Sequence, residues 1–343
     1  MSDIQIPADH PPVKKQKVGV LLINLGTPDA TDYWSVRRYL QEFLSDPRVI
    51  DLPRLPWQII LQLFILPRRP FASGHAYKMI WNNEKNESPL TTMTREQNDR
   101  LSTWLAQEKP DVVCDWAMRY GNPSIASKIE KLLGLGCDKI LLFALYPQYS
   151  AATNATAFDK AFDYLKTLKR QPAIRTVPTY HDHPLYIDSI ANSINAHIAS
   201  LDWKPDAVIA SFHGLPKRYL MEGDPYHCFC AKSGRLIREK LGLPKEQFHT
   251  TFQSRFGAAE WLKPYTDETV EQLAKSGVKN IAVVSPGFVS DCIETLEELN
   301  IRLRETFMEN GGENFTYIPC LNASEAGIDI FKEIIGNELK GWA

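Results

Sequence analysis

Short apolar runs recur along the chain, and segments with helical periodicity lie between them. The runs are continuous rather than alternating, which is typical of parallel strands that helices cover on both faces. Residues suited to helix N-termini, such as Asp32 and Ser124, open the intervening segments. The pattern therefore predicts an α/β fold with parallel sheets. The predicted strands span residues 18–25, 111–118, 139–147, 173–180, 206–212 and 280–286.

The predicted elements form two groups, from about residue 17 to 170 and from about 180 to 318, with no low-complexity linker between them. The chain has 343 residues, which is enough for two domains with cores of their own. Ligands commonly bind between domains, so a crevice between the two groups is expected. A last helical segment, 325–339, follows a strand-like run and fits either domain.

The charge balance narrows the class of partner. Lys and Arg number 39, Asp and Glu number 41, and the chain has no long basic block. A nucleic-acid binder carries a basic footprint, so we expect small molecules as partners and no nucleic acid. The six cysteines are scattered, which predicts a reducing compartment rather than a disulfide framework.

Two segments bear on the relation to membranes. Residues 1–19 are polar and contain proline, unlike a signal peptide, and the apolar stretch 52–66 is too short to span a bilayer. We therefore expect a cytoplasmic protein. Residues 52–66 form either an ordinary core helix or an exposed lip that touches a membrane surface, and the sequence leaves both open.

Polar or glycine-containing segments follow the apolar runs. In open parallel sheets ligands bind outside the carboxyl ends of the strands, so these segments are expected to share one rim. The first of them, 24–28, lacks the glycine spacing of a phosphate loop, which disfavours nucleotide binding. The segments are 24–28, 119–122, 148–150, 213–216 and 290–294.

Two of these segments carry candidate chemistry. His213 ends a buried strand, and a neutral imidazole can accept a proton or bind a divalent metal. If a helix begins near Ser290, then Asp291, Glu294 and Glu298 share one of its faces. A solvated acidic face is the alternative interpretation. The position of these carboxylates at the same rim as His213 favours a functional role.

Cys228 and Cys230 lie next to His227, which raises the question of a zinc or iron–sulfur site. A tetrahedral site needs four ligands, and no second pair stands at ligand spacing. The sequence therefore favours two thiols in a turn that leads into a helix.

Several long motifs resemble the ferrochelatases, enzymes that insert Fe2+ into protoporphyrin IX to make protoheme. They include SFHGLPKRYLMEGDPYHCFC from Ser211, QSRFGAAEWLKPYTDET from Gln253 and SPGFVSDCIETLEEL from Ser285. The likeness extends to VGVLLINLGTPDATDYWSVRRYLQEFLSDPRVIDLP and LYPQYSAATNATAFD, and it covers residues from about 17 to 340. Agreement of several blocks in order is more specific than any one motif.

The resemblance implies two Rossmann-like domains of chelatase type, each with a parallel four-stranded sheet flanked by helices, and a porphyrin cleft between them. The N-terminal domain is expected to comprise 17–172 together with 319–343 and to carry the lip. The C-terminal domain, 173–318, is expected to carry His213 and Glu294.

The resemblance also implies roles for individual residues. His213 and Glu294 are expected to be catalytic and to face each other at the metal-insertion site. Asp291 and Glu298 resemble further carboxylates of an acidic path, which gives a metal-binding set of His213, Glu294, Asp291 and Glu298. The porphyrin-binding residues are expected to be Leu25, Arg69, Tyr77, Ser88, Arg119, Tyr120 and Trp261.

Two departures separate this sequence from animal ferrochelatases. Those have a histidine where Cys292 stands, and they carry a C-terminal cysteine cluster, whereas no cysteine follows Cys320 here. A bacterial-type protein without a [2Fe-2S] cluster is therefore expected. No tightly bound cofactor is expected, with protoporphyrin IX and Fe2+ as substrates and a monomer rather than an oligomer.

Three rival functions stay open. Coproporphyrin ferrochelatase and cobalt chelatase belong to the same class of enzyme, and pocket polarity near the propionates would separate them. A two-domain heme- or solute-binding protein without turnover belongs to another class. A binder has no need of a proton acceptor that faces an acidic path, so His213 with Glu294 argues against it.

Overall fold

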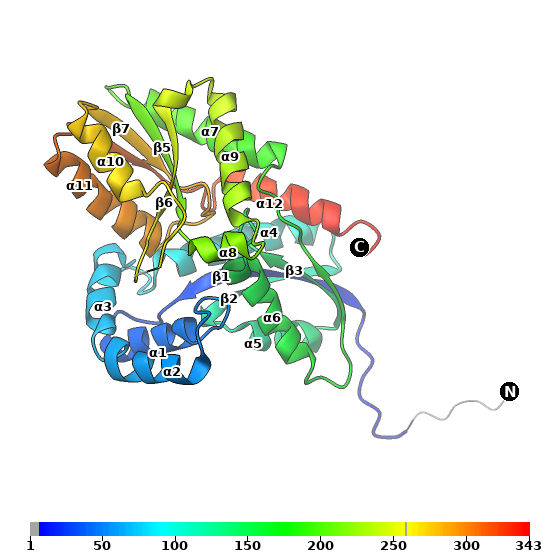
Figure 1. Ribbon diagram of the computed structural model, residues 1–343. Coiled ribbons are helices and arrows are strands. Elements are labelled where there is room, and N and C mark those ends of the chain that lie inside the picture. The colour runs from blue at the N-terminus through cyan, green and yellow to red at the C-terminus, as the bar shows by residue number, and fades with distance from the viewer. Residues whose placement is uncertain (1–6, 258) are drawn as a thin grey trace.

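The computed structural model describes residues 7–257 and 259–343. It contains two parallel four-stranded sheets covered by helices (Figure 1), which confirms the predicted α/β fold. The first sheet has the order β2-β1-β3-β4, with β1 Lys17–Thr27, β2 Val112–Gly121, β3 Cys137–Ala144 and β4 Ala173–Thr176. The second has the order β6-β5-β7-β8, with β5 Ala207–His213, β6 Phe248–Gln253, β7 Asn280–Val284 and β8 Asn314–Ile318.

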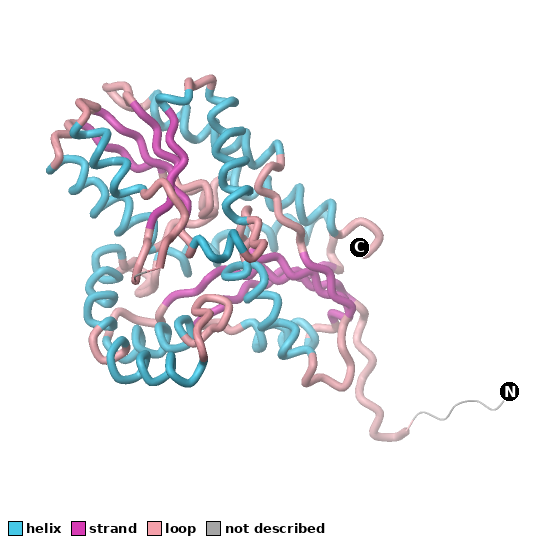
Figure 2. The backbone as a smooth tube through the Cα atoms, in the orientation of Figure 1, coloured by secondary structure: helices cyan, strands magenta, loops and turns pink. Residues whose placement is uncertain are grey.

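Both sheets therefore repeat one strand order, and Figure 2 shows them as two separate magenta layers. The helical elements are α1 Tyr33–Leu44, α2 Arg54–Ile60, η1 Leu61–Ile65, α3 Arg69–Ile80, α4 Pro89–Glu108, α5 Ile125–Gly134, η2 Ala151–Ala155, α6 Thr156–Leu165, α7 Pro184–Ala199, α8 Lys217–Met221, α9 Tyr226–Leu241, η3 Lys245–Gln247, α10 Thr266–Lys275, η4 Glu294–Leu303, α11 Arg304–Glu309 and α12 Glu325–Glu338.

The central strand β1 shows why its apolar run is continuous. Val20 and Leu22 belong to one buried cluster, whereas Leu21 and Ile23 belong to another. Successive side chains of a strand point to opposite faces, so both faces of β1 lie in apolar cores. The predicted N-cap at Asp32 is also confirmed, since its carboxylate accepts hydrogen bonds from two backbone N–H groups of α1.

Strand β6 was absent from the predicted set. Its sequence, FHTTFQ, has only two apolar residues, separated by three polar ones, and β6 lies at the edge of its sheet. An edge strand has a neighbour on one side only and does not need a continuous apolar run. The search for continuous apolar runs therefore misses β6, although it finds the edge strands β2 and β4.

The C-terminal helix α12 lies where the two halves of the chain meet. Phe331 of α12 packs edge-on against Phe143 of β3, with ring centroids 5.4 Å apart, and α12 also contacts α4 and α7. Beyond the helix, the Trp342 ring lies 4.3 Å from the Arg175 guanidinium of β4. Segment 319–343 thus contacts the first sheet through β3 and β4 and the second half of the chain through α7.

The carboxyl ends of the two sheets lie close to one another. In Figure 1 the arrowhead of β1 points toward α1, α2 and α3, and β6 descends toward the same region. Hydrogen bonds also link the halves there: Ser150 Oγ and the Ala151 amide donate to Asp224, at 2.9 and 2.7 Å. The fold thus brings the polar segments after both sheets to one region of the molecule.

A core truncation tests this packing. Leu142 is fully buried in the middle of β3, so Leu142→Ala removes apolar contacts on a strand with neighbours on both sides. We expect the free energy of unfolding to fall by about 2–5 kcal/mol, as measured by guanidinium denaturation. Leu135→Ala, at an exposed position after α5, is the matched control and should change it by less than about 0.5 kcal/mol. If both variants lost the same free energy of unfolding, the assignment of Leu142 to the core would be contradicted.

Candidate active site

His213 stands at the carboxyl end of β5 and is half-buried. Its Nδ1 atom lies 2.7 Å from the carbonyl oxygen of Gly214. A carbonyl oxygen can only accept, so Nδ1 carries the proton and Nε2 keeps its lone pair. The imidazole is therefore held in the tautomer that can accept a proton or bind a metal at Nε2.

Gly214 explains why the residue after His213 has no side chain. A Cβ atom there would lie 2.6 Å from the carbonyl oxygen of Gln253 and 3.1 Å from the Trp261 ring. The Leu262 amide also donates to the Leu215 carbonyl at 2.9 Å. The loop after His213 therefore packs tightly between β6 and Trp261. This packing restricts the backbone on which the imidazole is carried.

Glu294 opens η4, a π-helix, a rare form often found at functional sites. Burial raises the pKa of this carboxyl, and the neighbouring charge of Glu298 raises it further. A hydrogen bond with the Cys292 thiol and the charge of His213 act in the opposite direction. The net effect is an acid that holds its proton to higher pH than an exposed glutamate, close enough to His213 for the two charges to interact.

Asp291 departs from the sequence expectation. The helix was expected to begin near Ser290, but η4 begins at Glu294, so Asp291 precedes it and does not share its face. The Asp291 carboxylate accepts hydrogen bonds from the side chains of Thr295, Tyr317 and Asn322 at 2.7–3.0 Å. These bonds fasten the start of η4 to β8 and to the segment before α12.

Glu298 lies one turn of η4 beyond Glu294. Its carboxylate accepts a hydrogen bond from the Ser254 hydroxyl, and a guanidinium nitrogen of Arg302 lies 3.4 Å from Glu298 Oε1. Arg302 also pairs at 2.8 Å with Glu297, which is buried on another side of the helix. The line of carboxylates therefore runs from the cleft toward the surface and ends at an arginine.

Three tyrosines in the first half of the chain have pKa values to which the charge of Glu294 contributes. Burial raises the pKa of Tyr77 in α3 and of Tyr39 in α1, and the charge of Glu294 contributes to both shifts. Burial raises the pKa of Tyr146, just after β3, with a further contribution from Glu294. Helix α3, which carries Tyr77, contacts η4 directly.

Arg119 and Tyr120 are held together by Asp46, a residue that the sequence analysis missed. The Tyr120 hydroxyl donates to Asp46 Oδ2 at 2.8 Å, and Arg119 forms an ion pair with the same carboxylate. Arg119 also donates to Thr156 Oγ1 at 2.7 Å. Tyr120 is fully buried against Phe43 of α1. This network supports the wall of the cleft. The one available signal was an aspartate directly after α1.

The other expected porphyrin residues occupy different surroundings. Leu25 is partly buried and packs against Leu90, Met118 and Cys292. Ser88 is buried and caps α4, with its hydroxyl accepting from the Thr91 amide at 3.1 Å. Arg69 is exposed at the start of α3. The structure thus places the Trp261 ring against Gly214, the residue after His213, and puts Glu294 and Glu298 one turn apart on η4, whereas Arg69 is exposed.

Comparison with known proteins identifies the family. The family model described as Ferrochelatase matches residues 17–339. The ferrochelatase of Rhizobium etli (strain CIAT 652) is 59% identical over 342 residues, which cover 99% of each chain. The ferrochelatase of Agrobacterium fabrum is 58% identical over 337 residues, or 98% of each chain. The chain belongs to the ferrochelatase family.

Solved structures of distant chelatases share the fold. SirB from Bacillus subtilis with Fe3+ superposes with a TM-score of 0.55 at 12% identity, covering 95% of this chain and 98% of that one. The sirohydrochlorin chelatase SirB with cobalt gives a TM-score of 0.54 at 9% identity, covering 95% and 97%. At these identities the likeness concerns the fold, and it agrees with the two chelatase-type sheets.

In this ferrochelatase-family chain, the four predicted metal ligands do not form a ready-made coordination sphere. Within residues 7–257 and 259–343, no three His, Cys, Asp or Glu side chains are grouped so as to hold a metal ion. His213 ends β5 and Glu294 follows β7, the neighbouring strand of the same sheet, whereas the Asp291 carboxylate is already occupied by donors from the protein.

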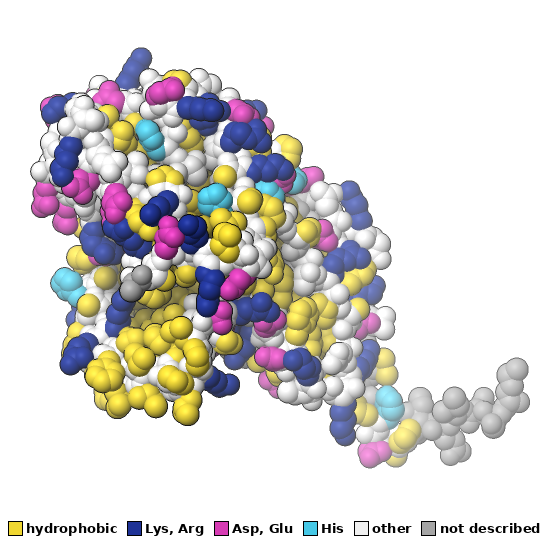
Figure 3. Space-filling view, in the orientation of Figure 1, with side chains coloured by type: hydrophobic (Ala, Val, Ile, Leu, Met, Phe, Trp, Pro, Cys, Tyr) yellow, Lys and Arg dark blue, Asp and Glu magenta, His cyan; other side chains and the backbone are white. Residues whose placement is uncertain are grey.

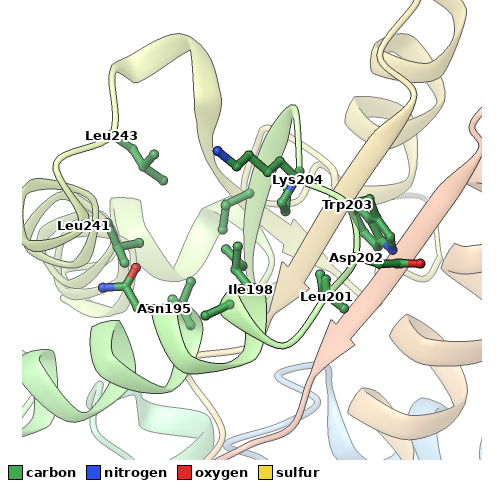
Figure 4. Close-up of a pocket in the computed structure, with 12 residues that line it drawn as sticks. Asn195, Ile198, Leu201, Asp202, Trp203, Lys204, Leu241 and Leu243 are labelled. Carbon is green, nitrogen blue, oxygen red and sulfur yellow. The ribbon is translucent and has the colours of Figure 1, made fainter.

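Two cavities lie outside the His213 region. One of about 540 Å3 is lined by α7, the loop before β5, and Leu241 and Leu243 (Figure 4). It reaches Val208, near the amino end of β5, whereas His213 is at the carboxyl end, so it contains none of the candidate residues. The other, of about 770 Å3, lies between α1 and α6 and borders Arg119 and Asp46.

The raised pKa of Glu294 predicts how its replacement affects stability. Between the pKa of the unfolded chain, about 4.3, and the higher pKa of the folded protein, the folded state binds more protons, so stability falls as pH rises. Glu294→Gln has no carboxyl group to ionise at this position, so its stability does not fall with rising pH for this reason. We expect the variant to be more stable than the parent at neutral pH, with a difference that shrinks toward pH 4, in thermal melts across this range.

Glu305→Gln is the matched control for the change of charge. Glu305 lies exposed on α11, so its replacement should shift stability by less than about 0.5 kcal/mol at every pH. A Glu294→Gln protein that is less stable than the parent at neutral pH would contradict the assigned burial of this carboxylate.

Proposed function

We propose that this chain inserts Fe2+ into protoporphyrin IX, giving protoheme and two protons, with His213 and Glu294 as the catalytic residues. Family membership across residues 17–339 supports the reaction. The observation that carries the assignment of residues is the pair itself: an imidazole with a free Nε2 lone pair interacts with a carboxyl whose pKa is raised. Both groups bind Fe2+ and accept protons.

The proposed mechanism follows from what insertion requires. Two pyrrole N–H bonds break, their electron pairs remain on the ring nitrogens, and Fe2+ binds to those nitrogens in place of the protons. His213 Nε2 and the Glu294 carboxylate first replace part of the water around the incoming Fe2+. As the iron moves to the ring nitrogens, the lone pairs that held it become free and accept the two leaving protons. Glu294 then passes a proton to Glu298, which is more exposed and leads to solvent.

The walls of the cleft are proposed to hold the macrocycle. Leu25, Tyr77 and Trp261 offer apolar and aromatic surface beside the reactive pair, and exposed Arg69 at the rim suits a propionate carboxylate. Arg119 and Tyr120 contribute through Asp46, and Ser88 contributes through the cap of α4. Asp291 is proposed to hold the start of η4 rather than to bind metal.

The proposed reaction uses no iron–sulfur cluster. Cluster iron is bound by thiolates. Burial raises the pKa of the thiols of Cys230, Cys292 and Cys320, which favours their neutral form. Cys228 and Cys230 lie inside α9 and not in a turn that precedes it, as the sequence had suggested; Cys228 is exposed and Cys230 is buried.

Loss of insertion activity in His213→Ala tests the function and the site together. The purified parent, incubated anaerobically with Fe2+ and protoporphyrin IX, should convert the porphyrin absorbance bands to those of heme. His213→Ala should bind porphyrin and insert iron about 10²–10⁴-fold more slowly, because it loses a proton acceptor and a metal ligand.

Two further arms make the test decisive. His10→Ala changes an exposed histidine in the N-terminal segment and should retain parental activity. Parallel assays with coproporphyrin, and with Co2+ in place of Fe2+, identify the preferred substrate. A parent that binds porphyrin without turnover would contradict the enzyme assignment, and a His213→Ala protein within tenfold of the parent would contradict the role of His213.

We further propose that the apolar patch on α2 and η1 contacts a membrane surface. Among the described residues, no helix combines the length and hydropathy needed to cross a bilayer. Figure 3 shows apolar side chains gathered over one end of the molecule, with a recess above them. The exposed members are Trp34, Leu52, Leu55, Ile59, Ile60, Leu63, Phe64 and Phe71. Patches of this kind mark interaction surfaces, and a porphyrin is itself apolar.

A double substitution in the patch should weaken vesicle binding. Leu63 and Phe64 are 63% and 58% exposed, and each would contribute about 1.5–3 kcal/mol if buried in lipid. We expect Leu63→Ser with Phe64→Ser to reduce co-sedimentation with phospholipid vesicles by tenfold or more. The control, Leu135→Ser with Phe162→Ser, changes exposed apolar residues outside the patch and should bind as the parent does. Equal binding by all three proteins would contradict the membrane contact.

A further inference from the structure

Gln253, the last residue of β6, is bonded to the elements that carry both catalytic residues. Its side chain is 6% exposed. Its Oε1 atom accepts from Ser211 Oγ of β5 at 2.8 Å, and its Nε2 donates to the backbone carbonyl of Glu294 at 2.8 Å. Its own carbonyl accepts from the Gly214 amide at 2.7 Å. A single buried residue thus contacts the strand of His213, the loop after it, and the start of η4.

The chemistry of these contacts requires a side-chain amide. The Glu294 carbonyl can only accept, so the atom facing it must be a donor. Ser211 donates to Oε1 on the other side, so the position needs one acceptor and one donor on a flat head group. A glutamate at position 253 would place a carboxylate oxygen against the Glu294 carbonyl oxygen, and both atoms are acceptors. A methionine would leave the Ser211 hydroxyl and the Glu294 carbonyl without their hydrogen bonds to residue 253.

The position of Gln253 gives these bonds their consequence. Gln253 is paired directly with His213 in the β5–β6 ladder, and its side chain reaches across to η4, which follows β7 in the chain. The distance between the His213 imidazole and Glu294 depends on how β5 and η4 are held together. Hydrogen bonds made by a buried group of low mobility are suited to fix such a distance.

We propose that Gln253 is a positioning residue that sets the separation of His213 and Glu294 for iron insertion. This inference rests on the proposed function. Gln253 acts through the two catalytic residues, since its bonds go to protein on every side that the structure records. A misplacement of about 1 Å between reacting groups can reduce a rate by about 10²-fold.

The test compares three variants by steady-state kinetics of iron insertion. Gln253→Glu preserves shape and the Ser211 bond but replaces the donor with an acceptor. It should lower kcat about 10- to 100-fold while leaving KM for protoporphyrin IX within about twofold. Gln253→Met, which lacks both bonds, should behave in the same way and provides the comparison if the glutamate variant does not fold.

Thr251→Val is the matched control. Thr251 lies two residues earlier on the same face of β6, and its hydroxyl bonds to Thr266 at 2.9 Å within the same buried polar cluster. The substitution removes a buried hydrogen bond without touching η4. It should lower the thermal midpoint but leave kcat within about twofold of the parent, which separates positioning from general packing.

Binding of Co2+ to the protein without porphyrin gives a readout that does not depend on turnover. His213 and Glu294 together should bind Co2+, followed by its visible absorption, and Gln253→Glu should weaken the Kd about tenfold, whereas Thr251→Val should not. If the parent binds Co2+ but inserts no iron, the proposed function fails and the Kd values still decide the role of Gln253. Three outcomes would overturn the proposal. The first is a Gln253→Glu protein with the kcat and Kd of the parent, and the second is a Thr251→Val protein that loses as much kcat and Co2+ affinity as Gln253→Glu. The third is a parent that binds no Co2+.

Discussion

Within each sheet all four strands run in the same direction, so every loop after a strand emerges at one edge. The two edges face a common region, and His213 and the segment that leads to Glu294 enter it from β5 and β7. The site depends on this convergence, because residues distant in the chain meet only if both sheets keep their orientation. Buried contacts between the halves, including α12 packed on the first sheet, maintain that orientation.

Glu294 shows how the surroundings shape the chemistry. Removing a carboxylate from water disfavours its charge, and a second carboxylate nearby adds to the effect. The protein offsets this at the outer end of η4, where Arg302 pairs with Glu297 and Glu298. Ser254 adopts φ 66°, a conformation costly for a residue with a side chain, and donates to Glu298. Backbone strain and charge are thus concentrated at Glu298, one turn of η4 beyond Glu294.

The apolar patch and the cleft are built from one segment of the chain. Helix α1 buries Val36 and Tyr39 toward the cleft wall, while Trp34 on the same helix is exposed beside the patch. Exposed apolar surface of this extent lowers solubility, so its presence at the mouth of a cleft for an apolar substrate has a physical rationale.

Local pattern was sufficient for much of this protein. Continuous apolar runs gave the parallel strands, Asp32 and Ser124 marked helix starts, and the position of His213 at a strand end pointed to the site. These features are encoded by neighbouring residues, because strand burial, capping and the rim of a parallel sheet follow from periodicity and chain direction. The family motifs supplied the reaction.

Only the tertiary structure decided the rest. The expected helix face of Asp291 depended on where η4 begins, and that start is set by bonds to Tyr317 and Asn322, which are distant in sequence. Asp46 and Gln253 gave no pattern, because each acquires its role from partners on other elements. The edge strand β6 has no continuous apolar run, because it has a neighbouring strand on one side only. A sequence encodes local preferences, whereas the partner of a buried polar group is chosen only when distant segments pack together.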